Sequence, residues 1–239
     1  MLFDVDSYTN LGDRECNEDS VYLGENGTGE RLFIVADGLG GHGGGDIASD
    51  IVVKTLAKRF RKGAFDIKEA IDTANADILA FQQEAMKKCK STVAAVYIKD
   101  DVLIAAHVGD SRIYAFSDGQ IVYQSQDHSA SQLAVTLGDI TPDQIRGHSD
   151  RNILTKALGA AESVKADIDS IPTDDIDAVL LCTDGFWECV TEDDMLFALS
   201  TTESAGDWLV KMIAVQRNAE VNGDKDNNSA VVLRKGDVR

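Results

Sequence analysis

The order of apolar and polar residues divides the first third of the chain into two strands and two helices. Residues 2–9 alternate between apolar and polar side chains, which predicts a strand, and residues 31–36 predict a second, mostly apolar strand. Apolar residues then recur at steps of three and four over 45–61 and again over 67–85. This spacing is typical of helices that pack one face against a core.

A block of short strands follows. The segments TVAAVYI, VLIAAHVG, RIYAF and QIVYQ are rich in β-branched residues, with tight turns predicted at Asp100-Asp101 and Asp118-Gly119. Residues 126–152 are polar, contain glycine and proline, and predict a long irregular insertion with one short helix. Long insertions in compact domains tend to be functional.

The last part of the chain repeats the alternation of strand blocks and helix pairs. Strands are predicted around 164–171 and 178–182, helices over 192–199 and 203–222, and a final strand at SAVVLR. Neither a regular βαβ repeat nor an all-β spacing fits this order. The pattern predicts a layered α+β fold, in which two mainly antiparallel sheets pack together with helices outside.

The composition is typical of one folded domain. The chain has 239 residues, 44% of them hydrophobic, with two prolines and no low-complexity run, so we expect a single domain over 1–239. The longest apolar runs are too short to cross a bilayer, which predicts no membrane insertion. The N-terminus shows no secretory signal, and the four cysteines form no CxxC pair. These features predict a cytoplasmic monomer with reduced thiols.

The charge excludes some classes of partner. The formal net charge is −18, so nucleic acid and anionic membrane surfaces would be repelled. Acidity of this size is commonly a matter of solubility alone. It also leaves open that some of the carboxylates cluster to hold cations.

Carboxylates do stand at the ends of several apolar strands. The segment FIVADGLGGHGGG ends its apolar run at Asp37, AVLLCTDG ends at Asp184, and VLIAAHVGD ends at Asp110. Asp226 precedes the final strand, and Glu18 lies between two others. Carboxylates that converge on one rim cannot all stay charged without cations, and Mg²⁺ and Mn²⁺ prefer oxygen ligands. One such aspartate is usually a turn former, so it is the repetition that indicates a metal site.

The same segments carry a family resemblance. In order along the chain they are RECNEDS, VADGLGGHGGGDIAS, STVAAVYI, HVGDSRIY, LLCTDGFWE and DKDNNSAVVL. Together they resemble the bacterial metal-dependent serine/threonine phosphatases of the PP2C or PPM family, over nearly the whole chain. The resemblance implies a four-layer α-β-β-α sandwich and identifies residues 126–152 as the flap. Leu39 in place of methionine and Ser91-Thr92 without the usual glycine depart from the family pattern but remove no ligand.

The resemblance implies a role for each carboxylate. Asp37 would bridge two metal ions, and the carbonyl of Gly38 would bind one of them. Asp184 and Asp226 would complete the first ion's shell, and Glu18 would hold the second ion through water.

Three further residues complete this implied site. Asp110, together with Asp184, would bind a more loosely held third ion. Asn227 and Asp19 would lie behind the ligands. The implied cofactors are two or three Mn²⁺ or Mg²⁺ ions, and oxygen ligands alone do not decide between the two metals.

The implied reaction is hydrolysis of phosphoserine and phosphothreonine in proteins. A metal-bridged hydroxide would attack phosphorus, while the Arg14 guanidinium clamps the phosphate oxygens. His42 is the candidate general acid for the departing alkoxide, and the alternative is a surface histidine in a glycine loop. No cysteine lies in a phosphate-cradling loop, so no phosphoenzyme is expected.

The implied partners are a phosphorylated protein substrate and a serine/threonine kinase whose targets this enzyme would dephosphorylate. The alternative is a pseudophosphatase that acts as a regulatory binding module, although every metal carboxylate is present. A purely structural cation site is a further alternative, but it leaves Arg14 unexplained.

Overall fold

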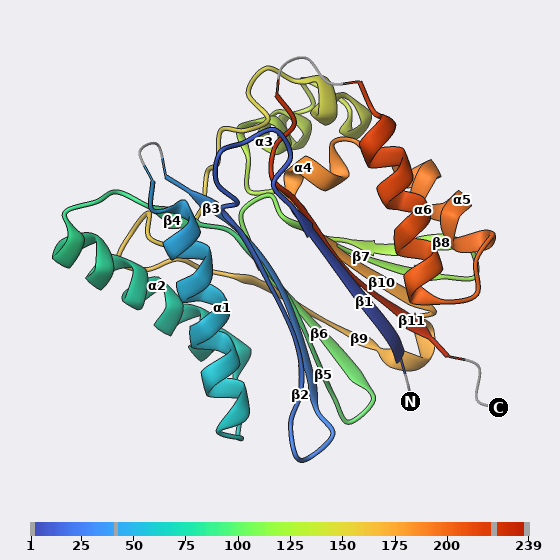
Figure 1. Cartoon of the computed structure of the whole chain (residues 1–239), viewed down its shortest axis with the longest axis horizontal. Coiled ribbons are helices and arrows are strands. Elements are labelled where there is room, and N and C mark those ends of the chain that lie inside the picture. The colour runs from blue at the N-terminus through green and yellow to red at the C-terminus, as the bar shows by residue number, and fades with distance from the viewer. Residues whose placement is uncertain (1–2, 41–42, 221–223, 237–239) are drawn as a thin grey trace.

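The chain forms two antiparallel sheets that pack face to face, with a pair of helices on each outer surface (Figure 1). This computed structural model describes residues 3–40, 43–220 and 224–236. The four layers confirm the predicted α+β sandwich.

The first sheet has the strand order β2-β3-β5-β6-β9, and a short strand, β4, also pairs with β3. Its neighbouring strands are antiparallel throughout. The strands are β2 (Asp19–Glu25), β3 (Arg31–Leu39), β4 (Lys90–Ser91), β5 (Val93–Lys99), β6 (Val102–Val108) and β9 (Asp167–Pro172). The sequence pattern did not predict β2, whose side chains are mostly half-buried rather than cleanly alternating.

The second sheet has the order β1-β11-β10-β7-β8. Its strands are β1 (Phe3–Asn10), β7 (Arg112–Ser117), β8 (Gln120–Gln124), β10 (Ala178–Cys182) and β11 (Asn228–Lys235). The strands β1 and β11 lie at opposite ends of the sequence but pair along their full length, from Phe3 opposite Lys235 to Asn10 opposite Asn228.

Two helix pairs cover the outer faces of the sheets. The helices α1 (Gly45–Arg61) and α2 (Ile67–Ala85) pack on the first sheet, and α5 (Glu192–Ser200) and α6 (Ala205–Asn218) pack on the second. The first pair has the predicted bounds. None of the helices in the described ranges is both long and apolar enough to cross a membrane.

Alternation along the strands divides the core into three layers. On β3, Leu32 and Ile34 face α1 and α2, whereas Phe33 and Val35 face the second sheet. Because successive side chains on a strand point to opposite faces, one apolar strand supplies both layers. This explains why the central strands are continuously apolar.

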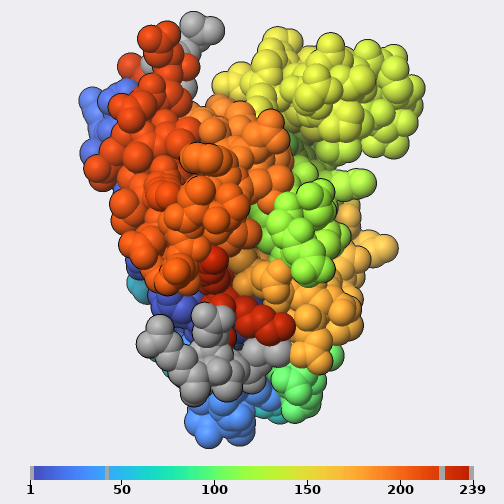
Figure 2. Space-filling model, turned by 90° about the vertical axis from the view of Figure 1, so that its right-hand side faces the viewer, coloured from blue at the N-terminus to red at the C-terminus, as the bar shows by residue number. Residues whose placement is uncertain are grey.

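Short helices gather at one end of the sandwich (Figure 1). The flap, residues 126–152, contains α3 (Ala130–Leu137) and a 3-10 helix, η1 (Pro142–Gly147), where the sequence predicted one helix. The helix α4 (Asp184–Trp187) follows β10 at this end, whereas a 3-10 turn, η2 (Thr173–Asp175), follows β9 at the opposite end. Figure 2 shows the flap, in yellow-green, as a lobe that projects beside α5 and α6, in orange.

Candidate metal and catalytic site

A pocket of about 560 Å³ opens at the end of the sandwich where β3 ends and α4 begins. Most of the residues singled out in the sequence line this pocket: Arg14, Glu18, Asp37, Gly38, Asp110, Asp184, Asp226 and Asn227. Asp19 is next to this group, opposite Asp37 in the β2–β3 pairing. His42 lies outside the described residues.

Hydrogen bonds to Thr92 fix the backbone of Asp37. The Asp37 N–H donates to the Thr92 hydroxyl at 2.9 Å, and the Thr92 N–H donates to the Asp37 carbonyl at 2.8 Å. The buried Ser91 hydroxyl also donates to that carbonyl, at 3.1 Å. Ser91-Thr92, which departs from the family pattern, therefore holds the end of β3 in place.

Two glycines allow the first turn of α1 to approach Glu18 closely. The Gly38 N–H donates to the Glu18 carbonyl at 3.0 Å. A Cβ atom on Gly45 would lie 2.5 Å from the Glu18 carboxyl carbon and 2.7 Å from the Gly38 carbonyl oxygen. Sequence analysis missed Gly45, because its role depends on a contact between α1 and the residues just before β2.

We expect Gly45→Ala to weaken metal dependence specifically. The added methyl must displace the Glu18 carboxylate or the Gly38 carbonyl, and shifting ligand groups lowers metal affinity by about tenfold. The measurement is the Mn²⁺ concentration that gives half-maximal hydrolysis. Gly27→Ala is the matched control, because a Cβ at Gly27 would meet nothing within 4 Å. An unchanged Mn²⁺ dependence in Gly45→Ala would contradict this role.

Asp110 is buried in the turn after β6. Its side chain is only 4% exposed, and the indole N–H of Trp187 donates to its carbonyl oxygen at 3.0 Å. Burial, with a further contribution from Asp127, raises the pKa of Asp110 to about 7. Trp187 is a buried core residue, and its hydrogen bond also helps to position the backbone of Asp110.

Asp184 and Asp226 face the pocket from neighbouring segments. Asp184 begins α4 and accepts a hydrogen bond from the Gly185 N–H at 2.6 Å. Asp226 accepts a hydrogen bond from the Arg14 guanidinium at 2.8 Å. The Arg14 side chain remains half exposed, so its other donors stay accessible from the pocket.

Asn227 connects the loop before β11 to the segment that carries Arg14 and Glu18. Its side-chain oxygen accepts from the Glu18 N–H at 2.8 Å, and its amide donates to the carbonyls of Leu11 and Cys16. Both the oxygen and the nitrogen of the Asn227 amide therefore help to fix the backbone of the segment that carries Arg14 and Glu18.

Asp19 is buried beside the pocket with only half of its carboxylate paired. One oxygen accepts from the Thr183 hydroxyl at 2.9 Å, and the other has no partner among the described residues. Burial raises the pKa of Asp19 to about 7, and the nearby carboxylates Asp226 and Glu18 add to the increase.

The surroundings of the pocket disfavour ionisation of the carboxyl groups that line it. Burial, followed by repulsion from Asp184, raises the pKa of Asp37 well above its usual range. Burial, followed by repulsion from Asp110, does the same for the pKa of Asp184. Burial and Asp46 also raise the pKa of Glu18. These carboxylates can all ionise near neutral pH only if cations compensate their charge.

The donor set fits hard divalent cations. The groups that face the pocket with free lone pairs are carboxylate and carbonyl oxygens, and no cysteine or described histidine lines it. Such ligands suit Mg²⁺ and Mn²⁺ rather than metals that prefer nitrogen or sulfur. The unpartnered oxygen of Asp19 also leaves an acceptor for ordered water behind the ligands.

The flap is joined to this end of the sandwich by one buried and one half-buried ion pair. Arg112 makes two hydrogen bonds of 2.8 Å to Asp127, and its guanidinium lies 3.5 Å from the centre of the Trp187 ring. Arg146 of η1 pairs with Glu192 at 2.6 Å. These contacts fix the base of the flap against α4 and α5.

A second group of possible metal ligands lies beside the flap. Coordinating atoms of His107, His128 and Asp167 lie within 4.8 Å of one another. The Gly109 N–H donates to His128 Nδ1, however, and the Lys156 ammonium lies 3.0 Å from His128 Nε2. A metal ion bound to His128 Nε2 would require the proton of the neutral ring to be on Nδ1. The Gly109 N–H already donates to Nδ1, which leaves no room for that proton. His128 is buried, which leaves little of its ring open to solvent.

Comparisons with known proteins agree with this arrangement. A sequence model of the family described as protein phosphatase 2C matches residues 8–223. The serine/threonine phosphatase stp of Listeria welshimeri is 30% identical over 234 residues, which is 93% of this chain and 91% of that protein.

Solved structures show the same similarity. The structure of serine/threonine phosphatase Stp1 from Staphylococcus aureus has a TM-score of 0.90 at 26% identity, with 98% of this chain and 96% of that chain covered. The catalytic domain of the serine/threonine protein phosphatase PstP, in complex with two manganese ions, has a TM-score of 0.81 at 28% identity. The match covers 98% of this chain and 99% of that one.

Proposed function

The chain belongs to the protein phosphatase 2C family and is a metal-dependent protein serine/threonine phosphatase, and from this premise we propose that the carboxylate pocket is its active site. The observation that carries this proposal is the convergence of buried and half-buried carboxylates and Arg14 on one pocket. A regulatory module without activity would not need this costly arrangement.

The proposed metal ligands are those that the family resemblance implies. Asp37 would hold both of two ions. The first ion would also be bound by the Gly38 carbonyl, Asp184 and Asp226, and Glu18 would hold the second through water. Divalent cations held there would supply a nucleophilic water at neutral pH and neutralise charge on the phosphoryl group. We propose Mn²⁺ or Mg²⁺, two ions with a third near Asp110.

The protein's own groups would orient the substrate. The half-exposed Arg14 guanidinium is held by Asp226 and can offer its remaining N–H groups to phosphate oxygens. Asn227 and Thr92 hold the backbones of Glu18 and Asp37, so the ligands need little rearrangement. We keep His42 as the proposed proton donor to the departing alkoxide.

Other features of the enzyme are also proposals. We propose that one domain spans residues 1–239, which the pairing of β1 with β11 supports. We also propose that the enzyme is a cytoplasmic monomer. Its substrates would be a phosphorylated serine/threonine kinase and the proteins that this kinase phosphorylates.

The direct test is hydrolysis of a phosphothreonine peptide by the native chain, with and without Mn²⁺ or Mg²⁺. We expect phosphate release that requires the metal and stops on addition of a chelator. Metal binding measured by calorimetry without any phosphate release would overturn the proposal and favour the binding-module alternative.

A further inference from the structure

The metal pocket continues into a cleft on both sides. A second pocket of about 560 Å³ shares Arg14, Asn152 and Asp226 with it. On the other side, a pocket of about 210 Å³ shares Leu39, Lys90 and Leu154 with it. A phosphorylated side chain in the metal pocket would therefore place the residues before and after it in two different surroundings.

One side of the cleft carries uncompensated positive charge. Lys88, between α2 and β4, and Lys90, the first residue of β4, both line the metal pocket and are both exposed. The ammonium groups of these two lysines make no hydrogen bond or ion pair with any other residue in the described ranges. Cys89, between them, is buried, and its carbonyl accepts from the Gln82 amide at 2.6 Å, so the segment itself is anchored.

The other side of the cleft offers no comparable cations. Arg151 pairs with Glu188, and Arg146 pairs with Glu192. The Lys225 ammonium donates to two backbone carbonyls at the end of α6. The charges left without a partner among the described residues that line this second pocket are acidic, Glu220 and Asp224.

We propose that Lys88 and Lys90 make the enzyme selective for phosphorylated segments with acidic residues on one side of the phosphorylated residue. This inference rests on the proposed function and names the substrate class for the same site. In a protein with a net charge of −18, two free lysines at the mouth of the site are the local feature that can attract an acidic segment. Glu220 and Asp224 would repel acidic residues on the opposite side, which makes the preference one-sided.

Three phosphothreonine peptides test this proposal with the full chain and Mn²⁺. One has two aspartates before the phosphothreonine, one has them after it, and one has neutral flanks. We expect one acidic peptide to be hydrolysed with kcat/KM about fivefold above the neutral peptide at low salt, because each exposed ion pair contributes modestly. The other acidic peptide should not exceed the neutral one, and high salt should abolish the preference.

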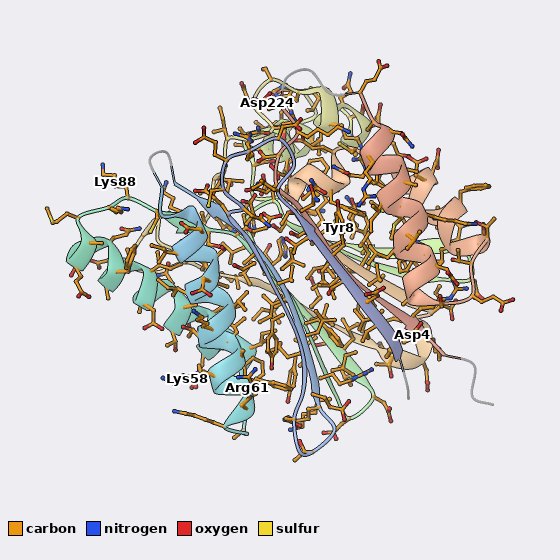
Figure 3. All side chains as sticks on the ribbon, viewed as in Figure 1. Asp4, Tyr8, Lys58, Arg61, Lys88 and Asp224 are labelled. Carbon is orange, nitrogen blue, oxygen red and sulfur yellow. The ribbon has the colours of Figure 1, made fainter. Side chains whose placement is uncertain are left out.

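The double variant Lys88→Glu/Lys90→Glu should eliminate or reverse the preference. Lys58→Glu is the matched control, because Lys58 is an exposed lysine near the far end of α1, whereas Lys88 lies at the pocket end of the same helix layer (Figure 3). It should retain the native preference.

The outcomes separate this proposal from the proposed function. Equal hydrolysis of all three peptides, or equal gains for both acidic peptides, overturns the selectivity but leaves the phosphatase intact. No hydrolysis of any peptide with Mn²⁺ or Mg²⁺ overturns the phosphatase itself. If the double variant does not fold, the salt dependence of the native preference decides alone, and a preference that survives high salt overturns the role of the lysines.

Discussion

Replacing Asp37 with asparagine is expected to lower metal-dependent hydrolysis of a phosphothreonine peptide by about a thousandfold or more. Asp37 would bridge the metal ions, and removal of a group that positions several others at once has effects of this size. An asparagine side chain keeps the shape but offers one neutral oxygen. The measurement is kcat/KM at saturating Mn²⁺.

The same variant should remain folded, which separates lost chemistry from lost structure. Desolvation, followed by repulsion from Asp184, raises the pKa of Asp37, so a neutral amide should keep or increase the melting temperature of the metal-free protein. Asp118→Asn is the control, because Asp118 is exposed at the β7–β8 turn and its positive φ of 49° suits asparagine. Near-native activity of Asp37→Asn would remove Asp37 from the catalytic site.

Without bound metal, the stability of the folded protein should decrease as the pH rises. The pKa values of Asp19 and Asp110 are raised to about 7, so the folded state binds protons more tightly than the unfolded chain does. Stability from this source is complete below the unfolded pKa of about 4 and is lost as pH rises to about 7. We expect the melting temperature of the metal-free protein to fall by about 10 °C between about pH 5.5 and 8.

Bound Mn²⁺ should remove most of this dependence, because cations compensate the ionised carboxylates. Asp110→Asn should make the metal-free profile shallower, and Asp118→Asn should leave it unchanged. Calorimetry with and without a chelator measures all of these profiles. If the melting temperature of the metal-free protein rises over the same range, ionisation of the buried carboxylates does not destabilise the folded state and the prediction is wrong.

The sequence predicted the four-layer fold because the apolar patterns of α1, α2 and β10 are strong and local. It did not predict β2, where the pattern is weak, or α4, which has only four residues. These elements form because their neighbours in space provide partners. Side-chain bonds such as that from the Thr183 hydroxyl to the Asp19 carboxylate link the residue before α4 to the start of β2, and no local pattern reveals them.

Most carboxylates of the site could be found because they stand at or next to the end of an apolar strand, and Glu18 was identified by the family resemblance. The residues that hold them could not, because Thr92, Gly45 and Trp187 act through contacts with distant segments. Ser91 illustrates the limit. Its departure from the family pattern was noted in the sequence, but its bond to the Asp37 carbonyl depends on the pairing of β4 with β3.

The pairing of β1 with β11 also bears on how the enzyme is made. During synthesis, β1 leaves the ribosome long before β11, its hydrogen-bonding partner. The loop before β11 also carries Asp226, so a nascent chain lacks both the sheet closure and one proposed metal ligand. Contacts between such distant segments form slowly, and we therefore expect activity to appear only after β11 has left the ribosome and paired with β1.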